Sequence, residues 1–138
     1  MALKRTDILG GWELVSFEAR DSRTGAARHP LGRQPRGLIL YTADGFMSAQ
    51  LAPEVASTHT EIGDYIAYGG PFQVDELEST VRHDVQMATM PDLLTQTQIR
   101  HVSFVEDRLV LSATMTAEDG STTHSTLVWQ RPDPPESR

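Results

Sequence analysis

Residues 37–51 read Gly-Leu-Ile-Leu-Tyr-Thr-Ala-Asp-Gly-Phe-Met-Ser-Ala-Gln-Leu and contain the clearest strand signal in the chain. A short apolar run, Leu38 to Tyr41, is closed by the turn sequence 42–45, and Phe46 to Leu51 resumes the strand-like pattern. An Asp-Gly pair between two such runs is a strong short-range signal for a β-hairpin. This stretch therefore predicts two antiparallel strands joined at Asp44-Gly45.

The period of two that marks strands continues on both sides of this hairpin. Upstream, Trp12, Leu14 and Ser16 alternate with Glu13, Val15 and Phe17. Downstream, further strands are expected over residues 72–78, 80–88, 95–105, 109–116 and 122–131, with turns at 106–108 and 117–120. Residues 53–68 lack the alternation and predict a short irregular or helical lid segment, which leads into a tight bend at Gly69-Gly70-Pro71.

These elements predict an all-β fold, a single closed antiparallel barrel of about eight strands, because closure removes exposed strand edges. A two-sheet sandwich is the alternative, but several strands look too polar on both faces to supply two apolar inner faces. The barrel domain is expected over residues 1–131, with Trp12 and Trp129 buried near the closing seam and Arg131 stacked on Trp12. The Pro-rich residues 132–138 predict a disordered C-terminal tail.

The composition excludes several classes of function. A formal net charge of −7 argues against nucleic acid as a partner. The chain has no cysteine, and Lys4 is its only lysine, so thiol chemistry and Schiff-base chemistry are not expected. No apolar run approaches the roughly 20 residues that span a bilayer, and residues 1–7 do not resemble a signal peptide, so a cytoplasmic location without membrane association is expected.

The ordered motifs of the chain resemble those of the bacterial lipocalin-like domain family, a calycin-type barrel. The resemblance rests on 9–16 (Leu-Gly-Gly-Trp-Glu-Leu-Val-Ser), 30–32, 37–48, the Tyr-x-x-Tyr-x-Gly-x-Phe pattern around 65–72, and the positions of His83, Arg100 and 129–131. It covers nearly all of residues 9–131 and departs from the family pattern at Pro71. Relatives of this barrel class include ligand binders and cofactor-free cyclases or isomerases, so either activity is implied.

Four residues are candidates for catalysis. His83 alternates with Arg82 and Asp84 and shares the face of Val81, Val85 and Met87, so an inward imidazole is expected. Tyr65 and Tyr68 would place hydroxyls at the barrel mouth, and the resemblance favours an inward Arg100. A core histidine bonded to a carbonyl, a surface arginine and a hydrophobic plug are the plain structural alternatives.

Five further residues are predicted to line an apolar pocket: Tyr41, Met47, Phe72, Met87 and Phe104. The five histidines, at positions 29, 59, 83, 101 and 124, have no metal-ligand spacing, and no phosphate-binding loop is present, so neither a metal nor a cofactor is expected.

Three hypotheses follow for function. The first is a cofactor-free cyclase or isomerase of bacterial secondary metabolism that acts on an apolar, polyketide- or terpenoid-like molecule. The second is a carrier with the same pocket and no chemistry, and the third is a barrel whose interior is filled. A homodimer is compatible with each.

Overall fold

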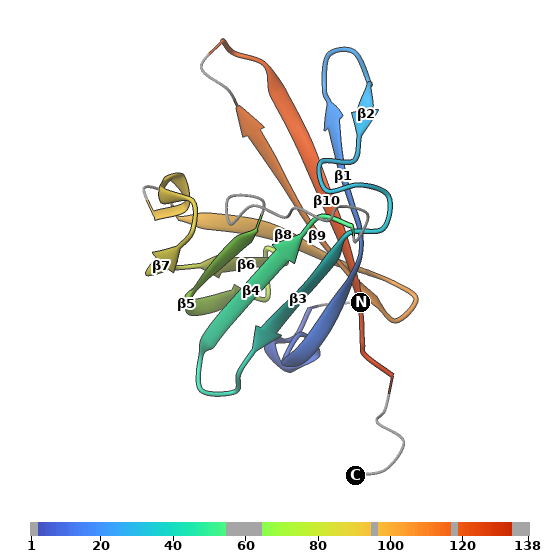
Figure 1. Ribbon diagram of the computed structural model, residues 1–138. Coiled ribbons are helices and arrows are strands. Elements are labelled where there is room, and N and C mark those ends of the chain that lie inside the picture. Colours follow the sequence, from blue (N-terminus) through green and yellow to red (C-terminus); the bar gives the residue numbers. More distant parts are fainter. Residues whose placement is uncertain (1–2, 55–64, 95–96, 117–118, 134–138) are drawn as a thin grey trace.

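Antiparallel strands build almost all of the computed structural model, which describes residues 3–54, 65–94, 97–116 and 119–133 (Figure 1). The strands are β1 (Gly10–Asp21), β2 (Ala27–Arg28), β3 (Arg36–Tyr41), β4 (Phe46–Ala52), β5 (Ile66–Asp75), β6 (Thr80–His83), β7 (Met87–Ala88), β8 (Gln98–Val105), β9 (Arg108–Thr116) and β10 (Thr122–Gln130). Two short 3-10 turns accompany them, η1 (Arg5–Asp7) and η3 (Pro91–Leu94).

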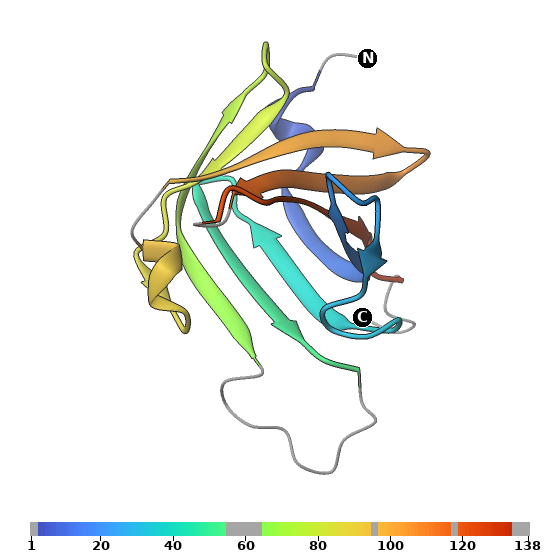
Figure 2. The same ribbon diagram turned by 90° about the horizontal axis from the view of Figure 1, so that it is seen from above.

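The sheet closes on itself through the first and last strands. Its order is β10-β9-β8-β6-β5-β4-β3-β1, and β1 also pairs with β10, while β2 and β7 are short additions to β1 and β5. Viewed from above, the strands surround a common interior (Figure 2). The predicted all-β, closed antiparallel barrel of eight strands is therefore confirmed, and the sandwich alternative is wrong.

The hairpin predicted over residues 37–51 is present as β3 and β4. β3 and β4 pair from Arg36↔Ala52 to Tyr41↔Met47, and the turn at Gly45 adopts a φ of +100°, which glycine tolerates without a steric cost. The amide N–H of Thr42 donates to the carbonyl of Phe46 and closes the turn. Ile39 and Tyr41 on one strand and Met47, Ala49 and Leu51 on the other all face the buried interior.

A β-bulge in β1 changes which side chains of that strand face inward. Leu14 pairs with Trp129, but the next pair is Ser16 with Val128, so Val15 is an extra residue. Beyond the bulge Phe17, opposite Leu127, takes the inner face and Ser16 the outer one. The expectation that Ser16 shares the face of Trp12 is wrong, because strict alternation cannot reveal an inserted residue.

The predicted bend at residues 69–71 is also wrong, because these residues lie within the continuous strand β5. Glycine is needed there for close approach of the backbone. A Cβ on Gly70 would lie 2.2 Å from the carbonyl oxygen of Asp84, and Pro71 and Gly69 accept hydrogen bonds from the amides of Asp84 and Gln86. The segment after β6 thus continues alongside β5. Its register changes by one residue between Phe72↔His83 and Gly69↔Met87, so the single strand expected over residues 80–88 is interrupted and forms β6 and β7.

Two of the predicted segments, the lid and the C-terminal tail, lie largely outside the described residues. Of the expected lid, residues 55–64 lie outside the described residues, and residues 66–68 already belong to β5. The expected tail falls mostly outside as well, since the description ends at residue 133.

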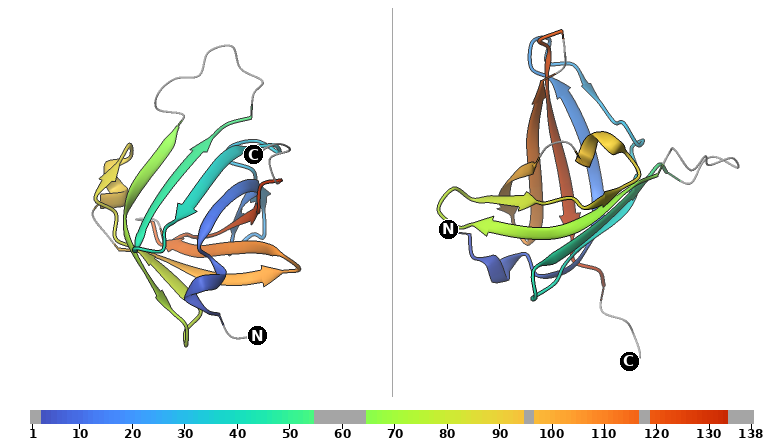
Figure 3. Two further views of the ribbon diagram at one scale, coloured as in Figure 1. Left: turned by 90° about the horizontal axis from the view of Figure 1, so that it is seen from below. Right: turned by 90° about the vertical axis from the view of Figure 1, so that its left-hand side faces the viewer.

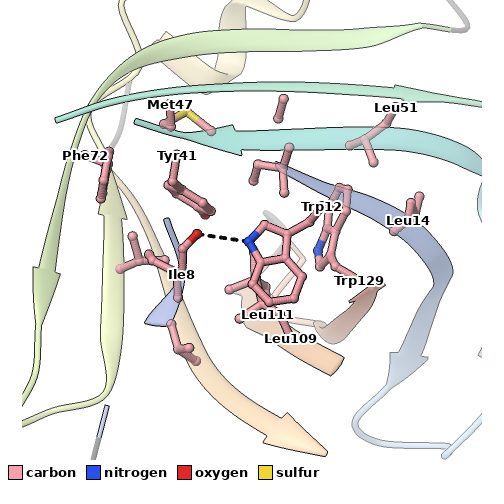
Figure 4. Close-up of a cluster of buried hydrophobic side chains, with 14 of the residues drawn as sticks. Ile8, Trp12, Leu14, Tyr41, Met47, Leu51, Phe72, Leu109, Leu111 and Trp129 are labelled. Atoms are coloured by element: carbon pink, nitrogen blue, oxygen red, sulfur yellow. Dashed lines mark hydrogen bonds between the residues drawn. The ribbon is translucent and has the colours of Figure 1, made fainter. Parts of the chain in front are cut away.

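One end of the barrel is sealed by aromatic and aliphatic side chains (Figure 4). Trp12 and Trp129 are 3% and 1% exposed, which confirms their predicted burial at the seam. The indole N–H of Trp12 donates to the Ile8 carbonyl at 2.9 Å. The Arg131 guanidinium stacks 3.7 Å from the centre of the Trp12 ring, as expected. We call this region, which also contains Leu109 opposite Trp129, the closed end.

At the opposite end, β1, β9 and β10 extend beyond the other strands (Figures 1 and 3). The register carries β10 from Trp129 at the closed end to Thr123 and Thr122, which pair with Asp21 on β1 and Thr116 on β9. The barrel wall is therefore taller on this side than on the side of β4 to β6.

Replacing Gly70 by alanine (Gly70→Ala) should destabilise the barrel, because the new Cβ meets backbone of Asp84 that cannot move alone. Overpacking of this kind costs about 1 to 3 kcal/mol. We expect the melting temperature to fall by about 3 to 10 °C in a thermal denaturation experiment. Gly11→Ala is the matched control, since the nearest atom there is the end of the Leu40 side chain at 3.3 Å. Equal melting temperatures for the two variants would contradict the close-approach argument.

Candidate functional site

Polar side chains gather on the inner faces of β3, β5, β6 and β8. In an antiparallel ladder, directly paired residues point to the same side of the sheet. Phe72 pairs with His83, His83 pairs with Gln98, and Val81 pairs with Arg100. Phe72 and Val81 belong to the buried core, so their partners face inward too. We call the inward set Tyr41, Tyr68, His83, Gln98 and Arg100 the polar cluster.

His83 lies at the centre of the polar cluster and is fully buried, with 0% of its surface exposed. The Tyr41 hydroxyl lies 2.7 Å from its Nε2, and the Tyr68 hydroxyl lies 3.5 Å from its Nδ1. A neutral imidazole has one donor and one acceptor nitrogen, so it can accept from one tyrosine and donate to the other. The three residues form a hydrogen-bonded row across β3, β6 and β5.

Burial fixes the protonation states of this row. Burial is the larger cause and the positive charge of Arg100 the smaller one, and together they lower the pKa of His83 to about 3. Burial also raises the pKa of Tyr68 and raises that of Tyr41 well above its ordinary value. At neutral pH the imidazole is therefore uncharged and both hydroxyls keep their protons, so the row is a set of neutral donors and acceptors.

Arg100 is the charged member of the polar cluster. Its Nη2 donates to Gln98 Oε1 at 3.1 Å, and its Nη1 donates to the backbone carbonyl of Ile99 at 3.2 Å. It is half-buried on the inner face, which answers the question left open by the sequence. Both acceptors are neutral oxygens, so the guanidinium has no carboxylate partner within the described part of the chain.

Not all of the predicted catalytic residues come together. Tyr68, His83 and Arg100 do, but Tyr65 precedes the inward Ile66, is 39% exposed, and borders a surface hollow of about 220 Å³ with Arg36 and Leu38. Sequence reasoning placed Tyr41 only among pocket residues and missed Gln98. Gln98 and Arg100 are two residues apart on β8 and therefore share one face, and this spacing was the signal in the sequence that could have identified Gln98.

The predicted pocket-lining residues divide between the interior and the outside. Phe72 packs edge-on against Tyr41 with ring centres 4.9 Å apart, and Met47 is buried beside them. Phe104 instead packs near Trp12 toward the closed end, at 6.4 Å. Met87 is 72% exposed on β7, because β6 ends at His83 and the alternation that linked the two residues stops there.

The interior is accessible at the end opposite the closed end. Several inward-facing apolar residues there, Phe17, Ile66 and Leu127, are partly exposed, whereas Trp12, Leu109 and Trp129 at the closed end are buried. Three small inward residues also lie side by side, since Ser125 on β10 pairs with both Ala19 on β1 and Ala113 on β9. Of these three, Ala19 and Ala113 are buried and Ser125 is partly exposed, so this part of the inner wall carries little side-chain volume. We call this region the open half; its partly exposed inward residues are Phe17, Ile66, Tyr68, Arg100, Ser125 and Leu127.

The described residues contain neither a metal-binding cluster nor a membrane-spanning helix. No group of three or more His, Asp or Glu side chains in this part of the chain is arranged to hold a metal ion. Within the same ranges, no helix has the length and apolar character needed to cross a membrane.

The chain belongs to the lipocalin-like domain family, whose model matches residues 9–132. This match covers the whole barrel from β1 to β10 and confirms the family resemblance seen in the sequence. No curated protein matches the chain significantly. A lipocalin-like barrel indicates the binding of a small hydrophobic molecule, which agrees with an interior that is apolar apart from the polar cluster.

The buried His83 should make stability depend on pH. In the unfolded chain its pKa is about 6.5, so the unfolded state takes up the proton first as the pH falls. The stabilisation is complete above that value and is lost as the pH falls toward the folded pKa of about 3. Each pH unit within this window costs up to about 1.4 kcal/mol.

Between about pH 6.5 and about pH 4.5, the wild type should lose about 2 to 3 kcal/mol more free energy of unfolding than His83→Gln. Urea denaturation of both proteins at both pH values measures this difference. Surface carboxylates titrate equally in the two proteins, so their contribution cancels. Parallel pH dependences would mean that the imidazole is not held neutral.

Proposed function

We propose that the protein binds an apolar small molecule in the open half of the barrel. The observation that carries this proposal is the contrast within one interior between a sealed end and partly exposed inward side chains at the other. Leu127, Ile66 and Phe17 would supply apolar contact area, and the small residues Ala113 and Ser125 would leave the volume that a ligand occupies.

Tyr68 is the polar handle that such a ligand would meet first. Its hydroxyl is half-buried, and the neutral His83 behind it fixes its direction. Because its pKa is raised, the hydroxyl remains a proton donor and suits a carbonyl oxygen on the ligand. His83 has no exposed surface, so in this arrangement it acts through Tyr68 as a positioning residue.

A cofactor-free cyclase or isomerase of bacterial secondary metabolism is the second candidate, with a polyketide- or terpenoid-like substrate in the cytoplasm. The specific observation in its favour is that a tyrosine hydroxyl lies at each ring nitrogen of His83. Such a row can adjust its hydrogen bonds as charge develops on a substrate oxygen. The enclosed barrel would hold a flexible substrate in a reactive conformation. The low pKa of His83 argues against a charged imidazolium as the acid, so Tyr68 would polarise the carbonyl.

Filling the open half should abolish binding. Ser125→Trp places an indole between Ala19 and Ala113, where the register leaves only small side chains. We expect the affinity for prodan, a neutral fluorescent naphthyl ketone, to fall by about tenfold or more, because the ring occupies the volume of the ligand. Fluorescence titration measures the affinity, and thermal melting checks the fold.

His124→Trp is the control for added bulk. It adds the same ring to the neighbouring residue, whose side chain is exposed on the outer face of β10. Its prodan affinity should stay within about twofold of the wild type. Equal loss in both variants, or no loss in Ser125→Trp, would place the probe outside the barrel.

Tyr68→Phe tests the hydrogen bond to a ligand carbonyl. The ring remains and only the hydroxyl is lost, so the emission of bound prodan should shift to the blue and its affinity should fall by about tenfold. Tyr65→Phe, on the outer side of the rim, should change neither property. In the catalytic case, Tyr68→Phe should also slow the conversion of substrate into a product of equal mass, followed by liquid chromatography and mass spectrometry. An unchanged emission spectrum would remove Tyr68 as the handle.

A further inference from the structure

We infer that the ligand carries a carboxylate, and that Arg100 is its counterion with the Tyr68 hydroxyl as a second donor. This inference deepens the proposed function and rests on it, since it requires a ligand in the open half. Three features support it: the hydrogen-bond partners of Arg100, the charges around it and the small residues on one side of it.

The guanidinium of Arg100 differs from two other strand arginines in what it contacts. On the outer face, Arg20 pairs with Glu18 at 2.7 Å and Arg82 pairs with Asp84 at 3.1 Å. Among the described residues, Arg100 on the inner face donates only to the neutral oxygens of Gln98 and Ile99. A guanidinium has five N–H donors in a planar fork, so donors remain for a carboxylate.

Acidic side chains are nearly absent from the inner faces of the described strands. By register Asp21 faces inward, but it lies at the end of β1, where its carboxylate accepts from the amides of Arg23 and Thr24 and is not buried. The other inward residues of the open half are apolar or uncharged. Although the net charge of the chain is −7, Arg100 has no compensating carboxylate among residues 3–54, 65–94, 97–116 and 119–133. A charge in partly desolvated surroundings is stabilised by an opposite charge, which a ligand would bring.

The residues on one side of Arg100 are small, which suits the binding of such a group there. On one side Arg100 pairs with Val81 of β6. On the other side, continuing the β8–β9 register by one residue from His101↔Ser112 places Ala113 opposite it. Ser125 and Ala19 follow Ala113 in the next two strands. Three small residues thus follow one another across β9, β10 and β1 on that side of Arg100, and Ala113 is the one on the adjacent strand.

Tyr68 lies on the same inner face and within electrostatic range of Arg100. Its hydroxyl, already oriented by His83 Nδ1, can donate to one carboxylate oxygen while the guanidinium binds the other. The remaining inner surface is apolar, which suits a hydrocarbon or ring system attached to the carboxylate. An apolar carboxylic acid is therefore the chemical class that fits.

Two probes that differ only in the charged group test the inference: 11-(dansylamino)undecanoic acid and its methyl ester. In fluorescence titrations of the full chain, the wild type should bind the acid about tenfold or more tightly than the ester. Arg100→Gln should remove that preference by weakening the acid while leaving the ester within about twofold, and Arg100→Lys should retain part of it.

Arg82→Gln is the matched control, because it removes the same charge from the outer face of the adjacent strand β6. Arg82 directly follows Val81, the residue that pairs with Arg100. It should leave the preference for the acid unchanged. Thermal melting of each variant establishes that it is folded.

Each other outcome overturns the carboxylate inference. Equal wild-type affinities for acid and ester, an unchanged preference in folded Arg100→Gln, or an equal loss in Arg82→Gln would each show that Arg100 is not the counterion. Failure of the acid to bind would do the same. Prodan binding that is sensitive to Ser125→Trp would still support the apolar site, so failure of this inference is distinguishable from failure of the proposed function.

Discussion

The pairing of β1 with β10 is the constraint on which the rest of the structure depends. It runs from Glu13↔Gln130 to Asp21↔Thr123 and turns a curved sheet into a closed wall. Closure leaves the wall without free edges and divides every strand into an inner and an outer face. The Arg131 guanidinium on the Trp12 ring lies just beyond this seam and links the last strand to the first at the sealed end.

Once the wall is closed, polar groups inside it must find partners inside it, because a buried polar group without a hydrogen bond is costly. His83 meets this requirement through Tyr41 and Tyr68, which occupy both ring nitrogens. Within the described part of the chain, Arg100 donates only to two neutral oxygens, those of Gln98 and Ile99. The difference separates a histidine whose hydrogen-bonding capacity is used within the protein from an arginine whose capacity is left for something else.

Much of the fold could be predicted from the sequence, because alternation and the Asp44-Gly45 turn are local signals. The inward direction of His83 followed from the same alternation within β6. Local patterns failed where a contact distant in sequence decides the outcome. The bulge after Leu14 reversed the face of Phe17, and the close approach of Asp84 to Gly70 kept residues 69–71 in a strand. The register change along β5 also ends β6 at His83, so the Met87 side chain is exposed on the outer face of the barrel. The bond from Tyr41 to His83 spans 42 residues of sequence and has no local signature.

The burial of His83 changes which residue should control ligand chemistry. An imidazole with a pKa near 3 and no exposed surface can neither carry a charge at neutral pH nor touch a ligand. What it can do is hold the Tyr68 hydroxyl in one direction. A tyrosine fixed in this way beside a cation makes a site for oxygen atoms, with neutral and charged donors at adjacent positions. Selectivity between ligands of equal apolar size would then depend on their oxygen groups, because the aliphatic wall of the open half offers no other means of distinguishing them.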